Sequence, residues 1–268
     1  MVILVLVGCE RDGDPGADAF SVPIPDRSRY AGCTSDLRSE HAAYTSLDHQ
    51  VYDPQGWPFE HRSDYDADGD DDQIDRYEER NAYGLYTEWT SDYVGVSVES
   101  TTATYDGAFW TAQDRWIDGR LDQRWTYTRP SERELVADVD LDGDGVVERS
   151  WRQSLNDEGR PELEELTDVD GRWISDERWT WSGDRLVEDV YQSASGGWSV
   201  TQSWTDAPGP DHATLTWFDE DGATELVYDA TLAYDAAGRE ASSTAALDLD
   251  GDGVVDETVA STTTWSCP

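Results

Sequence analysis

The sequence predicts an all-β protein: a large antiparallel meander of about 12–14 strands joined by Asp-Gly turns, curled or closed in a barrel-like way, with almost no helix. Turn signals such as Asp118-Gly119, Glu158-Gly159 and Asp221-Gly222 recur from Tyr93 onward at intervals of about 12 to 16 residues. Asp-Gly favours two-residue hairpins because both central positions take positive φ. No segment keeps a 3.6-residue apolar period over a dozen residues, so helix is expected only as a short piece near Ser39–Tyr44.

Between the turns, apolar and polar residues alternate with a period of two. The alternation is clear at residues 125–127, where Trp and Tyr flank Thr126, and at residues 213–217, where Ala, Leu and Trp are separated by Thr. Residues 94–98 show the same pattern with three Val, which predicts another strand there. A period of two places every second side chain on one face, so each segment is expected to be a strand with one buried face.

The charge of the chain argues against direct binding to nucleic acids and to anionic lipid surfaces. The 268 residues include 59 acidic side chains and 19 basic ones, a net charge of −40. Nucleic acids are bound through phosphates that Lys and Arg neutralise, and anionic lipid surfaces are attracted in the same way, so this chain is expected to bind neither directly. The 13 Trp and 13 Tyr supply enough apolar surface for a folded core.

The N-terminus resembles the end of a bacterial lipoprotein signal peptide. A short apolar run ends at Leu6-Val7-Gly8-Cys9, where the residues match a lipobox, and the chain then turns polar. The resemblance implies a truncated signal peptide at residues 1–8, a lipidated tether at residues 9–28 that starts with Cys9, and a single β-repeat domain at residues 29–268. It places the protein in the bacterial cell envelope, on the outer membrane, periplasmic or surface-exposed, and touching the membrane only through its lipid. The alternative is an apolar terminus with a chance cysteine.

The remaining cysteines, Cys33 and Cys267, lie near opposite ends of the expected domain. An even pair in an exported protein predicts a disulfide, although free thiols or an intermolecular bridge are the alternatives. The Cα atoms of a bridged pair lie within about 7 Å, whereas the ends of a flat sheet of a dozen strands lie roughly 50 Å apart. The ends of the meander must therefore meet, by closure or by one terminus crossing back.

Several turns resemble the YD repeats of bacterial Rhs-type proteins, in which Tyr-Asp is followed by two variable residues, Gly and Arg. Residues Tyr234–Arg239 match this pattern, although Glu240 stands where the repeat has an apolar residue. Asn156–Arg160, Tyr52–Gly56 and Phe218–Gly222 match in part. The resemblance implies curved, YD-shell-like sheets of stacked hairpins and brings no catalytic residue with it.

Three acidic segments carry the clearest chemical signal. Residues 140–148 and 248–256 are nearly identical, with carboxylates at loop positions 1, 3, 5 and 9 and Gly at position 6. They resemble EF-hand-like and thrombospondin type 3 calcium loops, in which oxygen ligands surround a hard cation. Without a cation, clustered carboxylates repel one another. Each loop lies between two predicted strands, so the ion would be structural and would hold a hairpin in place.

A third, less regular segment starts at Asp64 or, in a second register, at Asp66. Position 12, which is a bidentate Glu in EF-hands, falls on Asp75 here but on Trp151 and Val259 in the regular loops. We therefore expect weak affinity, about 10⁻⁴–10⁻³ M, typical of extracellular sites. The expected ligands of Ca²⁺ are Asp140, Asp142, Asp144 and Glu148; Asp248, Asp250, Asp252 and Asp256; and Asp64, Asp66, Asp68, Asp72 and Asp75.

No catalytic motif is found: the sequence has neither a nucleophile elbow, nor a zinc-protease helix motif, nor a phosphate-binding loop. The sequence therefore predicts a non-enzymatic, envelope-anchored, calcium-stabilised β-repeat lipoprotein with a structural or adhesive role. A surface glycan or a protein is the expected kind of partner, and the oligomeric state is left open. Two alternatives are a carbohydrate-binding or carbohydrate-cleaving domain that uses Trp faces, and a fragment of a YD-repeat shell.

Overall fold

The computed structural model describes residues 27–40, 44–81, 85–107, 109–205 and 209–268. The predicted fold class is confirmed, since the described residues form eighteen strands and one four-residue 3₁₀ helix, η1 (Arg27–Tyr30). The helical piece expected near Ser39–Tyr44 is wrong at Ser39 and Glu40, which end strand β1, and residues 41–43 lie outside the described residues. Within the described part of the chain, no helix has the length and apolar character needed to cross a membrane.

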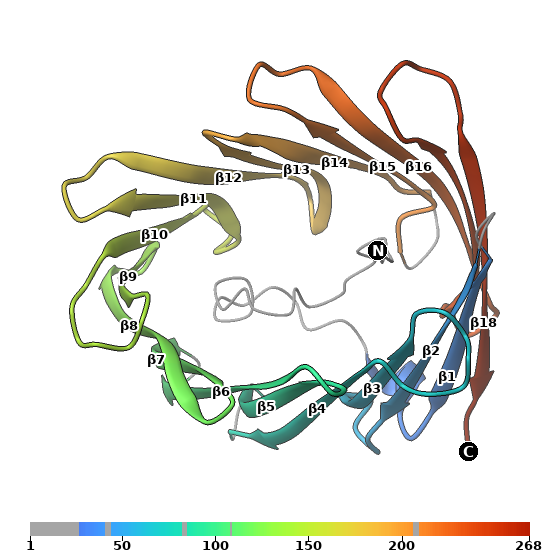
Figure 1. The fold of residues 1–268 in the computed structure, drawn as a ribbon, viewed down its shortest axis with the longest axis horizontal. Coiled ribbons are helices and arrows are strands. Elements are labelled where there is room, and N and C mark those ends of the chain that lie inside the picture. The colour runs from blue at the N-terminus through green and yellow to red at the C-terminus, as the bar shows by residue number, and fades with distance from the viewer. Residues whose placement is uncertain (1–26, 41–43, 82–84, 108, 206–208) are drawn as a thin grey trace. The chain divides into compact units, whose positions relative to one another are not determined.

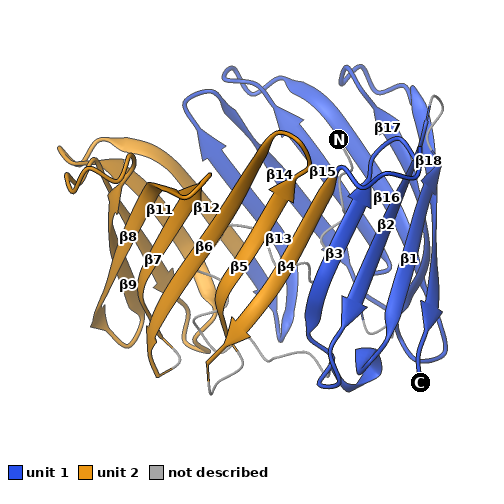
Figure 2. Cartoon of the chain, turned by 60° about the horizontal axis from the view of Figure 1, so that its bottom comes forward, with its two compact units in different colours: residues 1–11, 25–72, 180–268 blue, residues 12–24, 73–179 orange. Residues whose placement is uncertain are grey.

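The strands fall into two compact units, which are coloured separately in Figure 2. The strands have the following bounds: β1 (Thr34–Glu40), β2 (Thr45–Tyr52), β3 (Pro58–Asp64), β4 (Gln73–Arg80), β5 (Tyr86–Tyr93), β6 (Ser97–Asp106), β7 (Phe109–Ile117), β8 (Arg120–Ser131), β9 (Glu134–Asp140), β10 (Arg149–Leu155), β11 (Pro161–Asp168), β12 (Trp173–Ser182), β13 (Arg185–Ser193), β14 (Gly196–Ser203), β15 (His212–Phe218), β16 (Thr224–Tyr234), β17 (Glu240–Asp248) and β18 (Glu257–Ser266).

Unit 2 contains residues 73–179, and its strands β4 to β12 pair consecutively and antiparallel. One face of this sheet carries a core in which Trp151 contacts the rings of Trp125 and Tyr127 edge-on. Leu135 and Val139 of β9 lie in the same core and are almost fully buried. The alternation at residues 125–127 therefore predicted the buried face of β8 correctly.

Unit 1 contains residues 25–72 and 180–268, and its sheet joins the two ends of the chain. Strands β13 to β18 pair consecutively, β18 pairs with β1, and β1 pairs with β2, which pairs with β3 (Figure 1). The β1–β18 register runs from Thr34 opposite Ser266 to Glu40 opposite Ala260. The last strand of the meander is thus hydrogen-bonded to the first, as the cysteine positions require.

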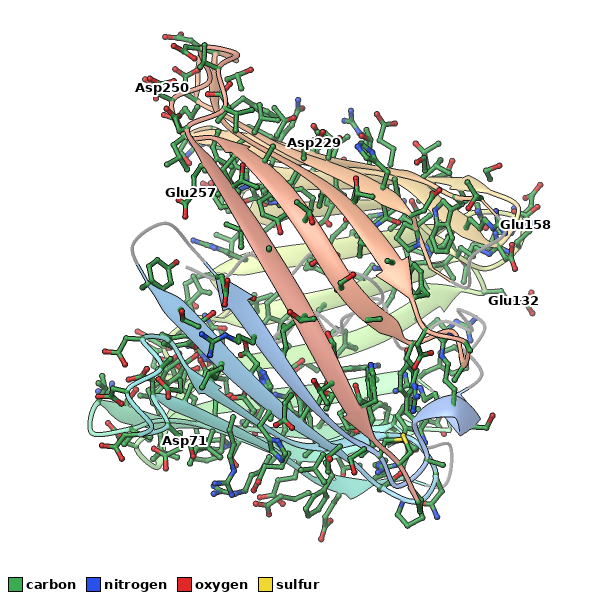
Figure 3. The ribbon with its side chains drawn as sticks, turned by 90° about the vertical axis from the view of Figure 1, so that its right-hand side faces the viewer. Asp71, Glu132, Glu158, Asp229, Asp250 and Glu257 are labelled. Carbon is green, nitrogen blue, oxygen red and sulfur yellow. A yellow bond between two sulfur atoms is a disulfide. The ribbon has the colours of Figure 1, made fainter. Side chains whose placement is uncertain are left out.

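The two faces of β16, β17 and β18 in unit 1 differ in polarity. Its core face carries Tyr228, Ala230, Ala245, Leu247 and Val259. The opposite face of β16, β17 and β18 is exposed and is built mainly from short polar and small residues: Thr231, Thr244, Thr258, Ala260, Thr262 and Thr264. Asp229 lies on the same exposed face of β16 (Figure 3). In these three strands the apolar residues therefore pack on one side and the other side meets water.

More strands are present than the turn signals predicted, and the excess lies at the N-terminus. Thirteen strands, β6 to β18, follow Tyr93, where the regular turn signals begin. Strands β1 to β5 precede it, in a region whose turns are irregular and whose alternation is masked by charged residues.

The strand predicted at residues 94–98 is wrong for residues 94–96 and correct for Ser97 and Val98, which begin β6. Val94, Gly95 and Val96 form the turn between β5 and β6, where the N–H of Val96 donates to the carbonyl of Tyr93 at 2.8 Å. Gly95 has a φ of 75°, and all three Val of the segment are exposed. Val94 and Val96 continue the alternation seen at Val98 of β6, but they lie in the turn and outside the strand.

Five of the turns that the structure describes in full share one geometry, and four of them are the segments that resemble YD repeats. Each begins with Asp or Asn, whose Oδ1 accepts N–H groups two and four residues later, and a Gly three residues later donates to its carbonyl at 2.9–3.1 Å. The φ of these glycines lies between 78° and 82°. The first residues of the five turns are Asp53, Asn156, Asp168, Asp219 and Asp235.

These turns correct the expected hairpin type. Asp118-Gly119 is a two-residue turn with positive φ at both positions, as predicted. Asp170-Gly171 and Asp221-Gly222 instead occupy the third and fourth positions of five-residue turns. The asparagine or aspartate at the start of the turn supplies the side-chain acceptor that holds it, which a search for Asp-Gly pairs alone overlooks.

The expected disulfide between Cys33 and Cys267 is present, with Cα atoms 4.2 Å apart. It lies directly beyond the last β1–β18 pair, Thr34 and Ser266. The rings of Tyr30, Tyr52 and Trp265 pack together beside it, with centroids 5.1–5.8 Å apart. We call the disulfide and these three rings the terminal clasp.

Glu240 begins β17 close to the terminal clasp, and its carbonyl accepts the indole N–H of Trp265 at 2.7 Å. Burial raises the pKa of its carboxyl, and a hydrogen bond with Ser243 offsets this in part. The group therefore contributes most to stability when protonated, below its ordinary pKa, and this contribution is lost as pH rises through its raised folded pKa.

We accordingly expect Glu240→Gln to increase the free energy of unfolding at pH 7, and the gain to disappear as the pH falls below 4.5. Urea denaturation at a series of pH values measures this. Glu225→Gln, on the exposed face of β16, is the control and is expected to change little. A Glu240→Gln variant that is less stable than the wild type at pH 7 would contradict the expectation.

Candidate metal sites

The three acidic loops follow strands of the sheet and share one backbone conformation. Residues 141–148 connect β9 to β10, residues 249–256 connect β17 to β18, and residues 65–72 follow β3. In each loop the N–H at position 9 closes the loop by donating to the carbonyl of the residue before position 1, at 2.8–3.0 Å. The expectation that the regular loops join neighbouring strands is correct, because β9 pairs with β10 and β17 with β18.

The same hydrogen bonds recur inside each loop. The position-6 N–H donates to the position-1 carboxylate at 2.7–2.9 Å. The position-2 N–H donates to the position-9 carboxylate at 2.8 Å in all three. The position-7 N–H donates to the position-5 carboxylate at 2.8–2.9 Å. The irregular loop therefore uses the register that starts at Asp64, and the alternative start at Asp66 is excluded.

Positive φ is needed at two loop positions, and the sequence signal showed only one of them. Position 6 is Gly in all three loops, with φ of 86–99°. Position 4 is also left-handed, at Gly143, Gly251 and Ala67, with φ of 55–71°. At Gly251 a Cβ atom would lie 2.1 Å from the carbonyl oxygen of Thr224, so the β17–β18 loop packs closely on the start of β16.

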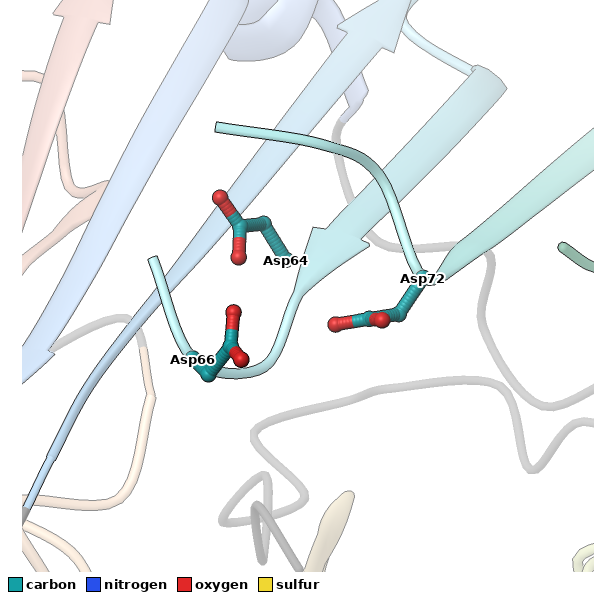
Figure 4. Close-up of side chains that lie close together, drawn as sticks. All are labelled: Asp64, Asp66 and Asp72. Atoms are coloured by element: carbon teal, nitrogen blue, oxygen red, sulfur yellow. The ribbon is translucent and has the colours of Figure 1, made fainter. Parts of the chain in front are cut away.

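Three carboxylates converge in each loop. One oxygen from each of Asp64, Asp66 and Asp72 lies within 4.8 Å of the others, as Figure 4 shows. The equivalent residues at positions 1, 3 and 9 converge in the other two loops: Asp140, Asp142 and Glu148, and Asp248, Asp250 and Asp256. Nine of the predicted metal-binding side chains are thus brought together in three groups of three.

The other four predicted ligands lie outside these groups. The position-5 carboxylates of Asp68, Asp144 and Asp252 accept the N–H two residues later, as described above. Asp75 is buried on β4, where its carboxylate accepts the side-chain amide of Gln73 at 2.9 and 3.1 Å.

The position-1 aspartate of each loop is buried beneath the loop that it begins. Asp64, Asp140 and Asp248 are only 6–7% exposed, although their partners at position 3 are largely open to solvent. Burial raises the pKa of Asp140, but the N–H groups of Gly145 and Gly143 outweigh it, and the net pKa is lowered. This carboxylate therefore stays ionised, as a ligand of a hard cation must.

Arginines near two loops are features that the sequence did not single out. Arg62 donates to Glu60 at 2.7 Å and to Asp71 of the irregular loop at 3.2 Å. Arg124 pairs with Asp114 at 2.6 Å, and the charge of Asp140 helps to raise its pKa. Both arginines occupy strand positions next to a loop, which only the strand register reveals.

The donor set suits Ca²⁺ or a similar hard cation. Every converging atom is a carboxylate oxygen, and calcium prefers several oxygen ligands at about 2.3–2.6 Å in flexible geometry. The β17–β18 loop lies at the opposite end of β18 from the disulfide, with Asp250 at its tip (Figure 3). A cation in this loop would therefore tie β17 to β18 at one end while the disulfide ties β18 to β1 at the other. The expected lipidation residue, Cys9, lies outside the described residues.

No protein-family model matches the chain, and no curated protein matches it significantly. Among solved structures, a porin-like protein from Bacteroides uniformis is 12% identical, with a TM-score of 0.48 over 87% of this chain and 96% of that one. A porin-like protein from Bacteroides vulgatus is 8% identical, with a TM-score of 0.30 over 87% and 98%. The structure of TcdB2-TccC3-TEV is 13% identical, with a TM-score of 0.32 over 79% of this chain and 13% of that chain.

Proposed function

We propose that the protein is a calcium-stabilised structural or adhesive module of the bacterial cell envelope. The observation that carries the proposal is the convergence of three carboxylates in each of three loops with the same hydrogen-bond pattern. Each group concentrates negative charge in a chain that already carries a net charge of −40. A divalent cation in each loop would remove this repulsion and fix the adjoining strands.

Calcium is expected to raise the melting temperature, and EDTA to reverse the rise. For sites with dissociation constants of about 10⁻⁴–10⁻³ M, 10 mM Ca²⁺ contributes about 1.4 to 2.7 kcal/mol per site by mass action. For a chain of this size, each kcal/mol corresponds to a shift of about 2–4 °C. Differential scanning fluorimetry across a calcium titration measures the effect, with an equal ionic strength of NaCl as the control.

Substitutions at position 3 make the test specific to the loops. In calcium, Asp142→Ala and Asp250→Ala are expected to lower the melting temperature, because each removes a ligand. In EDTA the same substitutions are expected to be neutral or stabilising, because each removes one of three repelling charges. Asp221→Ala is the matched control, because Asp221 is an exposed aspartate in a five-residue turn of unit 1. It should change the melting temperature by the same amount in calcium and in EDTA. An unchanged melting temperature in millimolar calcium would overturn the proposal.

The proposal also places a lipid on Cys9 as the link to the membrane. It rests on the lipobox residues before Cys9 and on the proline-containing segment that follows. Expression in a bacterium from the protein's own gene, with labelled palmitate in the medium, is expected to label the wild type and not Cys9→Ser. Equal labelling of the two would show that the anchor lies elsewhere.

A further inference from the structure

The two cysteines of the Cys33–Cys267 disulfide differ in exposure to solvent. Cys33 is 2% exposed. Cys267 is exposed at the end of β18. A thiolate in solution can therefore reach the Cys267 sulfur, and the Cys33 sulfur is then the one that leaves.

A guanidinium group contacts both sulfurs. The Nη1 atom of Arg239 lies 3.7 Å from the Cys33 sulfur and is also in contact with the Cys267 sulfur. Arg239 is held by Asp235, to which its Nε donates at 2.8 Å, and its guanidinium lies over the ring of Trp265. A cation in this position stabilises a thiolate, the charged form that thiol–disulfide exchange produces.

The other charged groups near this turn are Asp235, Arg29 and Glu240. Asp235 offsets part of the Arg239 charge, and its pKa is lowered by hydrogen bonds and by that charge although burial alone would raise it. Arg29 donates to the carbonyl of Gly238 at 2.8 Å. Glu240 has a raised pKa, as described above. Asp235 therefore reduces, but does not cancel, the stabilisation that the Arg239 charge gives to a thiolate at either sulfur.

The disulfide can open without separating the strands that it joins. Strands β1 and β18 remain paired over seven residues, from Thr34 opposite Ser266 to Glu40 opposite Ala260. Loss of the S–S bond therefore leaves the hydrogen-bonded ladder in place and changes only its end.

We propose that the Cys33–Cys267 disulfide is a site of thiol–disulfide exchange in the folded protein, opened by a dithiol that attacks Cys267 while Arg239 stabilises the departing Cys33 thiolate. In the first step the dithiol's thiolate bonds to the Cys267 sulfur, and the electron pair of the broken S–S bond passes to Cys33. The second thiol of the dithiol then loses its proton, attacks the mixed disulfide and releases Cys267 as a thiolate. The dithiol loses two electrons and two protons, and the protein disulfide becomes two thiols. This inference is independent of the calcium sites.

The test uses dithiothreitol as the dithiol and the full chain carrying Cys9→Ser, so that Cys33 and Cys267 are the cysteines whose reduction is measured. Reduction is quenched with a maleimide at intervals, and far-UV circular dichroism follows the fold in the presence of calcium. The rate of disulfide reduction is expected to rise in proportion to the dithiothreitol concentration, while the far-UV circular dichroism of the β-strands stays unchanged. A rate that does not depend on dithiothreitol concentration would mean that the bond opens only after unfolding, and would overturn the proposal.

The role of Arg239 is tested with Arg239→Met and the conservative Arg239→Lys. Arg239→Met is expected to slow reduction about threefold for each unit by which the leaving thiol's pKa rises. Arg172→Met is the matched control, because Arg172 has the same place in the Asp168 turn of unit 2, and it should leave the rate unchanged.

A second measurement distinguishes this role from a purely structural one. In the reduced wild type, the pH dependence of alkylation is expected to show a cysteine pKa below the ordinary value of about 8.5. Arg239→Met should raise that pKa, and Arg239→Lys should restore part of the shift. Equal rates in Arg239→Met and wild type, or an ordinary cysteine pKa in the reduced wild type, would overturn the proposal. If Arg239→Met does not fold, the wild-type pKa and concentration dependence decide the outcome.

Discussion

Replacing Cys33 and Cys267 together by alanine is expected to lower the free energy of unfolding by up to roughly 5 kcal/mol. The two residues are separated by 234 positions, and a cross-link that closes so long a loop removes much of the conformational entropy of the unfolded chain. Because β18 and β1 remain paired in the folded state, the loss should come mainly from the unfolded state and the strand register should persist.

Urea denaturation in constant calcium measures this effect. The full chain with Cys9→Ser is the reference, so that both proteins lack the third cysteine. Adding dithiothreitol should leave the stability of the double variant unchanged, and it should lower the stability of the reference toward that of the double variant. A loss below about 1 kcal/mol would contradict the chain-entropy argument.

Replacing Trp151 by alanine is expected to cost about 3–5 kcal/mol, because it opens a large cavity in the core of unit 2. The Trp151 side chain is 2% exposed, and its ring contacts Trp125 and Tyr127 at centroid distances of 6.2 and 6.0 Å. These edge-to-face contacts disappear together with the buried apolar area.

Trp173→Ala is the control for this substitution. Trp173 lies in the same unit but is 48% exposed, so its removal should cost much less. Thermal and urea unfolding of the two variants provide the comparison. Equal losses for Trp151→Ala and Trp173→Ala would contradict the assignment of the core.

Much of the fold could be predicted from the sequence because its signals are local. Period-two alternation marks a strand wherever the sheet has one buried face, as at residues 125–127. Residues 213–217 lie in strand β15 as predicted, but of the expected buried face Ala213 is buried whereas Trp217 is 38% exposed. The same alternation failed at Val94 and Val96, which lie in the turn before β6, although Val98 belongs to that strand. Local pattern alone does not reveal what packs against a segment.

The candidate metal sites were predictable to a similar extent. Carboxylate spacing located all three loops, and the disulfide followed from the cysteine count. The register at Asp64 and the left-handed residue at position 4 depend on backbone hydrogen bonds that spacing does not encode. The contact of Arg239 with the two sulfurs joins residues distant in sequence, so only the three-dimensional arrangement brings it to light.

The pairing of β18 with β1 has a consequence for how the protein folds. Strand β1 is synthesised early, but one of its two neighbours is the strand that lies last in the sequence. Such non-local pairing is slow to form, and until it does β1 presents an unpaired edge that can recruit other chains. The solvent-facing positions of β1 are Asp36, Arg38 and Glu40, and charged side chains of this kind discourage edge-to-edge aggregation. The charged residues of β1 therefore reduce the risk of aggregation during the time before β18 pairs with it.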